Sequence, residues 1–244
     1  MKRLWTLLLA LAITLSAGAA AWASDLQVYA ESGFCADQCL MGESLTPECE
    51  VTPWAAGASF TSGPWLLGAD YIDRQIALPS RERDLSVTEG EPTLAIDTYD
   101  LYAGARLVSA KCFKLYGLAG FASDTAKFAC PPITILGNMN GIAFGLGASL
   151  TAGPLIFDGK ILTVPHADTS LALRHSCGEG WGEIGRNLDG GSMTMADARC
   201  LWPLNKQIAV YLAYHWIAAD LAGEKTYHCG QASWYAAGVN IAFF

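Results

Sequence analysis

The sequence predicts an all-β protein, an antiparallel transmembrane β-barrel of about eight strands, within a range of eight to ten. Three observations predict this fold. Bulky apolar residues alternate with small or polar residues at a period of two along most of the chain. The alternating segments are about ten residues long, and tight and long connections take turns between them. An apolar N-terminal segment has the form of an export signal.

The composition favours a protein with a large core or a lipid-facing surface. Of the 244 residues, 52% are hydrophobic and only 16% are charged, which argues against a disordered chain. The formal net charge is −8, and no cluster of Lys and Arg follows the first three residues. Nucleic-acid binding normally needs a basic patch, so we expect no nucleic-acid partner.

Residues 1–23 are predicted to be a signal peptide. Lys2 and Arg3 form a positive start, and the apolar stretch over residues 4–16 is too short to span a bilayer comfortably. Ala21-Trp22-Ala23 then supplies the small-x-small pattern of a cleavage site, so cleavage is expected at its end. Loss of the two basic residues leaves 13 basic and 23 acidic residues, a net charge of −10.

All eight cysteines follow the predicted cleavage site, and an even number in an exported chain indicates disulfides. We expect residues 24–53 to form a cysteine-containing segment ahead of the barrel. The pairing is open, although a Cys177–Cys200 bridge would close a Gly-rich connection and contribute about 3 kcal/mol. No C-x-x-C pair occurs, and we expect no metal site. The disulfide candidates are Cys35, Cys39, Cys49, Cys112, Cys130, Cys177, Cys200 and Cys229.

Alternation predicts strands over residues 54–244, which we assign to the barrel domain. Ile142, Phe144 and Leu146, for example, share one face, and small residues such as Gly145 occupy the other. No helical periodicity competes with this pattern, which favours an all-β barrel. The predicted strands are 54–61, 65–76, 96–109, 113–123, 140–151, 155–163, 206–219 and 233–244.

Tight and long connections alternate, as in membrane barrels with turns at one end and loops at the other. Two of the tight connections contain Gly-Pro, a common turn pair. The tight connections are 62–64, 110–112 and 152–154, and the long ones are 77–95, 124–139 and 164–205.

The placement of charge favours a lipid-facing outer surface. Charged residues gather in connections such as 81–84 and 179–189, and the strand cores are nearly free of charge. A soluble, lipocalin-like periplasmic barrel that binds an apolar ligand is the alternative, and it would turn its apolar residues inward. The aromatic residues expected to form girdles at the two membrane interfaces are Trp54, Trp65, Tyr71, Tyr99, Tyr102, Trp202, Trp216 and Trp234.

The signal peptide, the strands rich in Gly and aromatic residues, and a last strand from Trp234 to Phe244 together carry a family resemblance. The chain resembles the small outer-membrane β-barrels of Gram-negative bacteria, the OmpA- and OmpX-like superfamily. This resemblance implies a porin-type barrel in the outer membrane, with outer-membrane lipid and the barrel-insertion machinery as partners. In that family the machinery reads a terminal aromatic residue. Here the apolar face runs through Val239, Ile241 and Phe243, one residue out of the family's register.

The resemblance also implies that both termini lie with the tight turns, whereas the eight strands predicted here place both termini with the long connections. A missed strand would correct this. Leu26–Glu31 and Thr169–His175 are candidate strands, and Asp158-Gly159 is a candidate hairpin turn inside a predicted strand.

The expected function is non-enzymatic: a structural role in the envelope, a surface interaction through the long loops, or limited passage of small solutes. Asp70, Arg106 and Lys114 are expected to be lumen charges. An eight-stranded interior is usually filled by side chains, which disfavours a porin with large flux. His215 alternates with Tyr211 and is expected to be a hydrogen-bonded lumen residue.

A lipid acyl hydrolase of the outer membrane is the enzymatic alternative, and it needs a serine activated by a nearby histidine. His175 and Ser176 are the weak candidates. Barrel-type lipid A deacylases have a His-x-Ser spacing, whereas these two residues are adjacent and would point to opposite faces of a strand. We therefore assign no catalytic residue and expect no cofactor, and enzymatic activity stays open.

Overall fold

The computed structural model describes residues 24–40, 43–44, 50–77, 93–130, 133–177, 180–188, 190–221 and 228–243. Their strands belong to one 13-stranded sheet. Within these ranges, no helix is long and apolar enough to cross a membrane.

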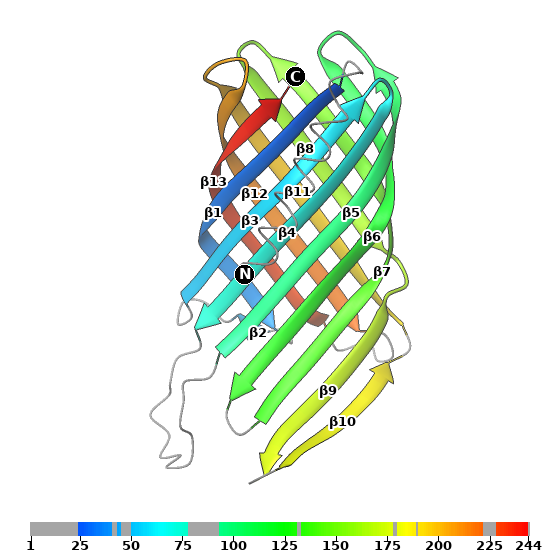
Figure 1. The fold of residues 1–244 in the computed structure, drawn as a ribbon, viewed down its shortest axis with the longest axis vertical. Coiled ribbons are helices and arrows are strands. Elements are labelled where there is room, and N and C mark those ends of the chain that lie inside the picture. Colours follow the sequence, from blue (N-terminus) through cyan, green and yellow to red (C-terminus); the bar gives the residue numbers. More distant parts are fainter. Residues whose placement is uncertain are drawn as a thin grey trace.

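Ten of the described strands close into an antiparallel barrel (Figure 1). Each strand pairs with the next one around the ring, and the last strand pairs with the first. Pairing between β7 and β8 completes the closure. In order around the ring the strands are β1 (Ser24–Leu40), β3 (Glu50–Ser62), β4 (Trp65–Ala77), β5 (Thr93–Ser109), β6 (Phe113–Cys130), β7 (Ile133–Ala152), β8 (Leu155–Val164), β11 (Gly191–Pro203), β12 (Ile208–Leu221) and β13 (His228–Phe243).

Two shorter pieces lie outside the ring. β9 (Asp168–Cys177) and β10 (Gly180–Leu188) form a hairpin that extends the barrel wall (Figure 1). The hairpin is attached through β9, which pairs with residues 133–140 of β7. β7 therefore has two successive partners, β9 near its start and β8 near its end. β2 (Glu43–Ser44) pairs with the end of β1.

The two ends of the barrel differ in their connections. At one end, here called the turn end, short turns join β3 to β4, β5 to β6, β7 to β8 and β11 to β12. The start of β1 and the end of β13 lie at this end as well (Figure 1), as the family resemblance implies. Gly63 and Gly153, each followed by proline, have φ values of 57° and 61°, a left-handed conformation that glycine adopts without steric cost. The opposite end is called the loop end.

The eight predicted strands are all present, and two more complete the ring, so the count reaches the upper limit of the predicted range. One of the two is β1, which contains the candidate strand Leu26–Glu31. Residues 24–40 and 50–53, which were predicted to precede the barrel, therefore belong to its strands. The second, β11, lies inside the predicted connection 164–205, where Met, Thr and Ala give a weaker alternation than Val, Ile or Phe.

The proposed turn at Asp158-Gly159 is wrong. Both residues lie inside β8 and are paired on both sides, with Ser149 and Ala148 of β7 and with β11. The other candidate, Thr169–His175, is a strand, but it belongs to the hairpin outside the ring.

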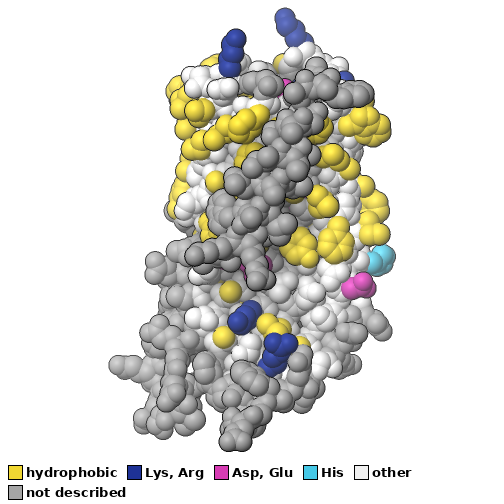
Figure 2. All heavy atoms as spheres, viewed as in Figure 1, with side chains coloured by type: hydrophobic (Ala, Val, Ile, Leu, Met, Phe, Trp, Pro, Cys, Tyr) yellow, Lys and Arg dark blue, Asp and Glu magenta, His cyan; other side chains and the backbone are white. Residues whose placement is uncertain are grey.

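The outer surface of the barrel is apolar. Leu101, Ile142 and Leu212 are 62–63% exposed although they lie in the middle of long strands. Figure 2 shows hydrophobic side chains gathered over the barrel wall nearer the turn end, with Lys and Arg side chains toward both ends. A soluble barrel with an apolar interior would instead carry polar and charged side chains on its outer surface.

Aromatic side chains border this surface, but two of the predicted girdle residues are not among them. Trp65 and Trp202 are exposed near the turn end, and Tyr99 is exposed farther along β5, toward the loop end. Trp234 is 1% exposed inside the barrel, and Tyr102 packs against the interior core. Their positions in the strand alternation direct both side chains inward, so residue type alone does not identify a girdle residue.

The terminal strand keeps the register that the sequence indicates. Val239, Ile241 and Phe243 of β13 are exposed on the outer surface, and Asn240 between them is buried. The offset from the family's register is therefore real in this part of β13. Phe244 lies outside the described residues.

Candidate functional site: the barrel lumen

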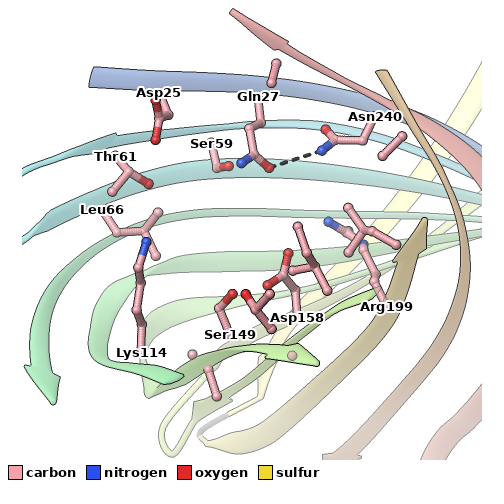
Figure 3. Close-up of a pocket in the computed structure, with 18 of the residues that line it drawn as sticks. Asp25, Gln27, Ser59, Thr61, Leu66, Lys114, Ser149, Asp158, Arg199 and Asn240 are labelled. Carbon is pink, nitrogen blue, oxygen red and sulfur yellow. Dashed lines mark hydrogen bonds between the residues drawn. The ribbon is translucent and has the colours of Figure 1, made fainter. Parts of the chain in front are cut away.

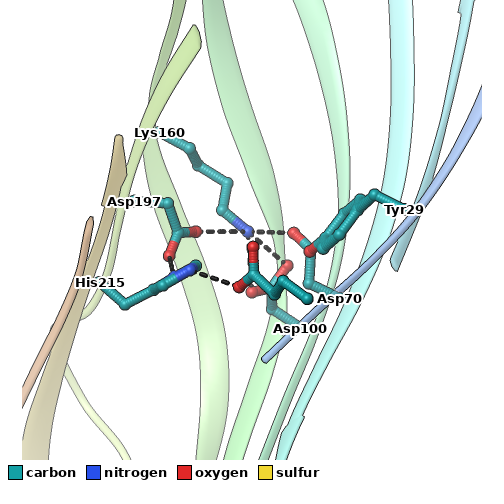
Figure 4. A network of polar contacts seen from close by, with 7 residues as sticks. Tyr29, Asp70, Asp100, Lys160, Asp197 and His215 are labelled. Carbon is teal, nitrogen blue, oxygen red and sulfur yellow. Dashed lines mark hydrogen bonds and ion pairs between the residues drawn. The ribbon is translucent and has the colours of Figure 1, made fainter. Parts of the chain in front are cut away.

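Lys160 of β8 lies at the centre of a polar cluster inside the barrel (Figure 4). Its Nζ is 2.9 Å from Asp100 Oδ2 and 3.3 Å from Asp197 Oδ2, and it also forms an ion pair with Asp70. The four side chains are at most 11% exposed. Because charges removed from water must be paired, this lysine and its carboxylates hold each other in place across the lumen.

His215 of β12 extends the cluster to β1. Its Nδ1 is 2.6 Å from Asp197 Oδ1, and its Nε2 is 2.5 Å from Glu31 Oε1. The imidazole is 1% exposed and stacks on the Trp234 ring at a centroid distance of 4.9 Å. The prediction that His215 is a hydrogen-bonded lumen residue is confirmed.

Tyrosine rings cover the buried cations. The guanidinium carbon of Arg199 is 3.7 Å from the centroid of the Tyr29 ring, and the Tyr29 hydroxyl donates a hydrogen bond to Asp70. Nζ of Lys160 is 4.6 Å from the centroid of the Tyr102 ring. These contacts give the cations favourable partners inside the lumen.

Inward-facing glycines make room for these rings. A Cβ at Gly68 would overlap the ring of Tyr102, and one at Gly57 would overlap Tyr29 and the Asp70 carboxylate. At Gly238 an added Cβ would meet Tyr211 in the same way. The small residues of the alternating pattern thus allow bulky side chains of neighbouring strands to fill the lumen.

Gly68→Ala is expected to destabilise the barrel by about 1–3 kcal/mol, because the added methyl group displaces Tyr102 from its place over Lys160. Urea unfolding of the protein in lipid vesicles would measure the change. Gly185→Ala on the hairpin is the matched control, since a Cβ there meets nothing within 4 Å. Equal stability of the two variants would contradict this account of the packing.

Further layers fill the lumen on the loop-end side of the cluster. Arg74 Nη2 is 2.8 Å from Asp124 Oδ1 and 2.9 Å from Thr98 Oγ1, and its guanidinium lies 5.8 Å from the centroid of Trp234. Beyond this layer, Ile76 packs in an apolar cluster with two residues of β5. Buried side chains therefore occupy the lumen from its middle toward the loop end.

On the turn-end side the lumen is hollow. A cavity of about 420 Å³, called the vestibule here, extends from the turn end down to Lys160 and Arg199 (Figure 3). Gln27, Asp158 and Lys114 are among its wall residues. Asn240 Nδ2 donates a hydrogen bond of 3.2 Å to Gln27 Oε1 across its wall. The vestibule is lined by both polar and apolar side chains and reaches the buried cluster at Lys160.

The three predicted lumen charges have different places. Asp70 belongs to the buried cluster, as expected. Lys114 is exposed at the wall of the vestibule. Arg106 is half-buried, and its strand partner is Tyr116 of β6. Lys160 and Asp197 were not predicted to be lumen charges, although their inward positions in the alternation of β8 and β11 were an available signal.

The weak catalytic candidates are consecutive residues of β9, in the hairpin outside the ring. His175 pairs with Ile133 and with Gly182, and Ser176 pairs with Trp181. The backbone therefore places the two at successive strand positions, as the sequence analysis assumed. Their side chains lie outside the described part of the structure.

Cys112 and Cys200 are free thiols, Cys112 in the turn between β5 and β6 and Cys200 on β11. The Cys177–Cys200 bridge that the sequence left open is therefore not formed. Cys200 lies on β11 near the turn end, and Cys177 lies at the tip of the β9–β10 hairpin. The two residues are therefore at opposite ends of the molecule. The remaining candidates, Cys35, Cys39, Cys49, Cys130, Cys177 and Cys229, have side chains outside the described part of the structure.

Comparison with known proteins gives likenesses in structure only. No protein-family model and no curated protein matches the chain. The attachment invasion locus protein Ail of Yersinia pestis is 12% identical, with 90% of this chain and 97% of that chain covered and a TM-score of 0.39. The translocator domain of the autotransporter NalP from Neisseria meningitidis is 10% identical, with 98% of this chain and 97% of that chain covered and a TM-score of 0.41.

The outer membrane phospholipase A of Escherichia coli is 12% identical, with 89% of each chain covered and a TM-score of 0.34. Identities this low transfer no activity or partner to this chain. The architecture rests on the strands themselves: an even-numbered antiparallel ring with an apolar exterior, and an interior that holds buried ion pairs beside apolar side chains. This closed barrel is the architecture of the outer-membrane β-barrels of Gram-negative bacteria.

Proposed function

We propose that this protein is an exported barrel of the outer membrane with a structural or surface-interaction role, and that its lumen does not conduct solutes. The observation that carries the proposal is the pairing of an apolar exterior with a charged, packed interior. Such an exterior is costly in water and favourable in a lipid bilayer. Cleavage after Ala23 and disulfides among the cysteines outside the described side chains belong to the same proposal.

The orientation follows from the two ends. In outer-membrane barrels the short turns and both termini face the periplasm, and longer loops face the outside. Applied to this chain, the rule directs the vestibule to the periplasm and the β9–β10 hairpin to the cell surface. The hairpin and the connections of the loop end are therefore the proposed contact region for a surface partner.

A limited solute pore is the second candidate, since the vestibule occupies part of the lumen. The layers around Lys160 and Arg74 argue against it, because ion pairs and buried side chains fill the rest. No contact of the described residues favours an acyl hydrolase. A soluble barrel does not fit the exposed Leu101, Ile142 and Leu212.

Envelope fractionation of a Gram-negative host that expresses the chain tests the location. We expect the mature protein in the outer membrane, with a different gel mobility before and after boiling. The same samples with and without reductant test the disulfides. A periplasmic, freely soluble protein with no mobility shift would overturn the assignment.

Single-channel recording in planar bilayers tests the closed lumen. We expect no open-channel conductance above the bilayer baseline for the purified protein. A steady conductance would instead favour the pore, and the ion pairs of Lys160 would then have to open. The recordings are informative only for protein that has passed the boiling assay as a folded barrel.

A further inference from the structure

Among the charged residues of the vestibule, Asp158 and Arg199 have opposite charges and form no ion pair with each other. Asp158 of β8 and Arg199 of β11 are direct cross-strand partners, and both line the cavity (Figure 3). Directly opposed charges on neighbouring strands usually attract each other into contact. Among the described residues, however, no ion pair joins Arg199 to any carboxylate.

Each of the two side chains lies beside another group. Asp158 is the strand partner of Ser149 on β7, and both residues line the cavity (Figure 3). The Arg199 guanidinium lies over the ring of Tyr29, with its carbon 3.7 Å from the ring centroid, and a second ring, Tyr211, lies 5.8 Å away. Its Nε is buried without a hydrogen-bond partner. A carboxylate and a guanidinium thus line the same cavity without forming an ion pair.

The remaining wall carries further charged residues nearer the turn end, together with uncharged polar groups and an apolar patch; these charged residues are Asp25, Lys111, Lys114 and Lys206. Gln27 and Asn240 present amides that are bonded to each other, and Ser59 presents a hydroxyl (Figure 3). Leu66 and Ile156 line the same cavity. A volume of about 420 Å³ is within the range of small-ligand sites, which are partly apolar and carry a few fixed polar groups.

We propose that the vestibule binds a small zwitterion of the amino-acid class. Its carboxylate pairs with Arg199, its ammonium pairs with Asp158, and its side chain lies toward Leu66. A simple anion would be attracted by the Arg199 guanidinium but repelled by the nearby Asp158 carboxylate. A simple cation would be attracted by Asp158 but repelled by Arg199. A ligand with both charges on a short frame satisfies the two together, which is why the zwitterion is favoured.

The test uses the full-length barrel in detergent and four related probes: L-leucine, N-acetyl-L-leucine, L-leucinamide and N-acetyl-L-leucinamide. Titration followed by ligand-observed NMR measures their affinities. We expect saturable binding of L-leucine and at least tenfold weaker binding of the three blocked forms, since each lacks at least one charged contact. Comparable affinity of any blocked form, or no saturable binding of L-leucine up to its solubility, would overturn the proposal.

Two variants assign the charges, and a third serves as control. In Asp158→Asn the advantage of L-leucine over N-acetyl-L-leucine is expected to disappear, and in Arg199→Gln its advantage over L-leucinamide is expected to disappear. Lys127→Gln removes an exposed charge of β6 outside the vestibule and should change neither ratio. Ratios that stay at the wild-type value in folded Asp158→Asn protein would refute the site, even if Arg199→Gln does not fold.

Discussion

Leu146→Arg is expected to destabilise the membrane-inserted barrel by about 2–4 kcal/mol, the cost of an arginine near the bilayer midplane on a lipid-facing strand position. Leu146 is the middle residue of the outward row that runs from Ile142 to Leu150 on β7, and it is 48% exposed. Urea unfolding of protein folded into phospholipid vesicles measures the change in the free energy of unfolding.

Leu204→Arg is the matched control for this substitution. Leu204 is 62% exposed and lies in the turn between β11 and β12, at the turn end. There the same change should cost only about 0–1 kcal/mol, because the charge reaches interfacial water. In a soluble barrel both leucines would face water and both substitutions would be nearly neutral. Equal, small effects at the two positions would therefore refute the lipid-facing surface.

Lys160→Met is expected to lower the free energy of unfolding by about 3–5 kcal/mol, since it leaves buried carboxylates without their counter-charge. Asp70, Asp100 and Asp197 all pair with this lysine, and the first two have side chains that are 3–4% exposed. Methionine preserves most of the side-chain volume, so the loss reports charge rather than a cavity. The measurement is the same urea titration in vesicles.

Lys114→Met separates this effect from a general loss of positive charge. Lys114 is exposed at the vestibule wall, so the change there should stay within about 0.5 kcal/mol. The double variant Lys160→Met/Asp100→Asn should regain part of the stability, because one unpaired carboxylate is removed as well. A Lys160→Met protein as stable as Lys114→Met would show that the cluster does not hold the barrel together.

The strands themselves could be predicted because alternation is a local signal. In the segment from Ile142 to Leu150 the bulky residues mark the outer face and the glycines mark the inner face, and the structure has the same arrangement. β11 was not predicted because most of its outward positions carry small residues rather than a run of bulky side chains. These positions include Thr194, Ala196, Ala198 and Cys200. The total number of strands, and with it the end of the barrel on which the termini lie, depended on β1 and on this weak segment.

The lumen site was only partly accessible to sequence reasoning. Asp70 could be recognised as an inward charge and His215 as a bonded histidine from their places in the alternation. Their partners could not be recognised. Lys160 lies 90 positions from Asp70 in the chain, and no local pattern relates two strands on different sides of a barrel.

The sequence by itself determined the all-β class and which face of each clearly alternating strand is apolar, and it predicts the export signal. All three depend on patterns among residues that are close together in the chain. Only the tertiary structure decided that ten strands close the ring, that Tyr102 and Trp234 point inward, and that Lys160 meets three carboxylates in one layer. Strand count and shear set which inward residues share a level of the barrel, and that geometry exists only once the ring has closed.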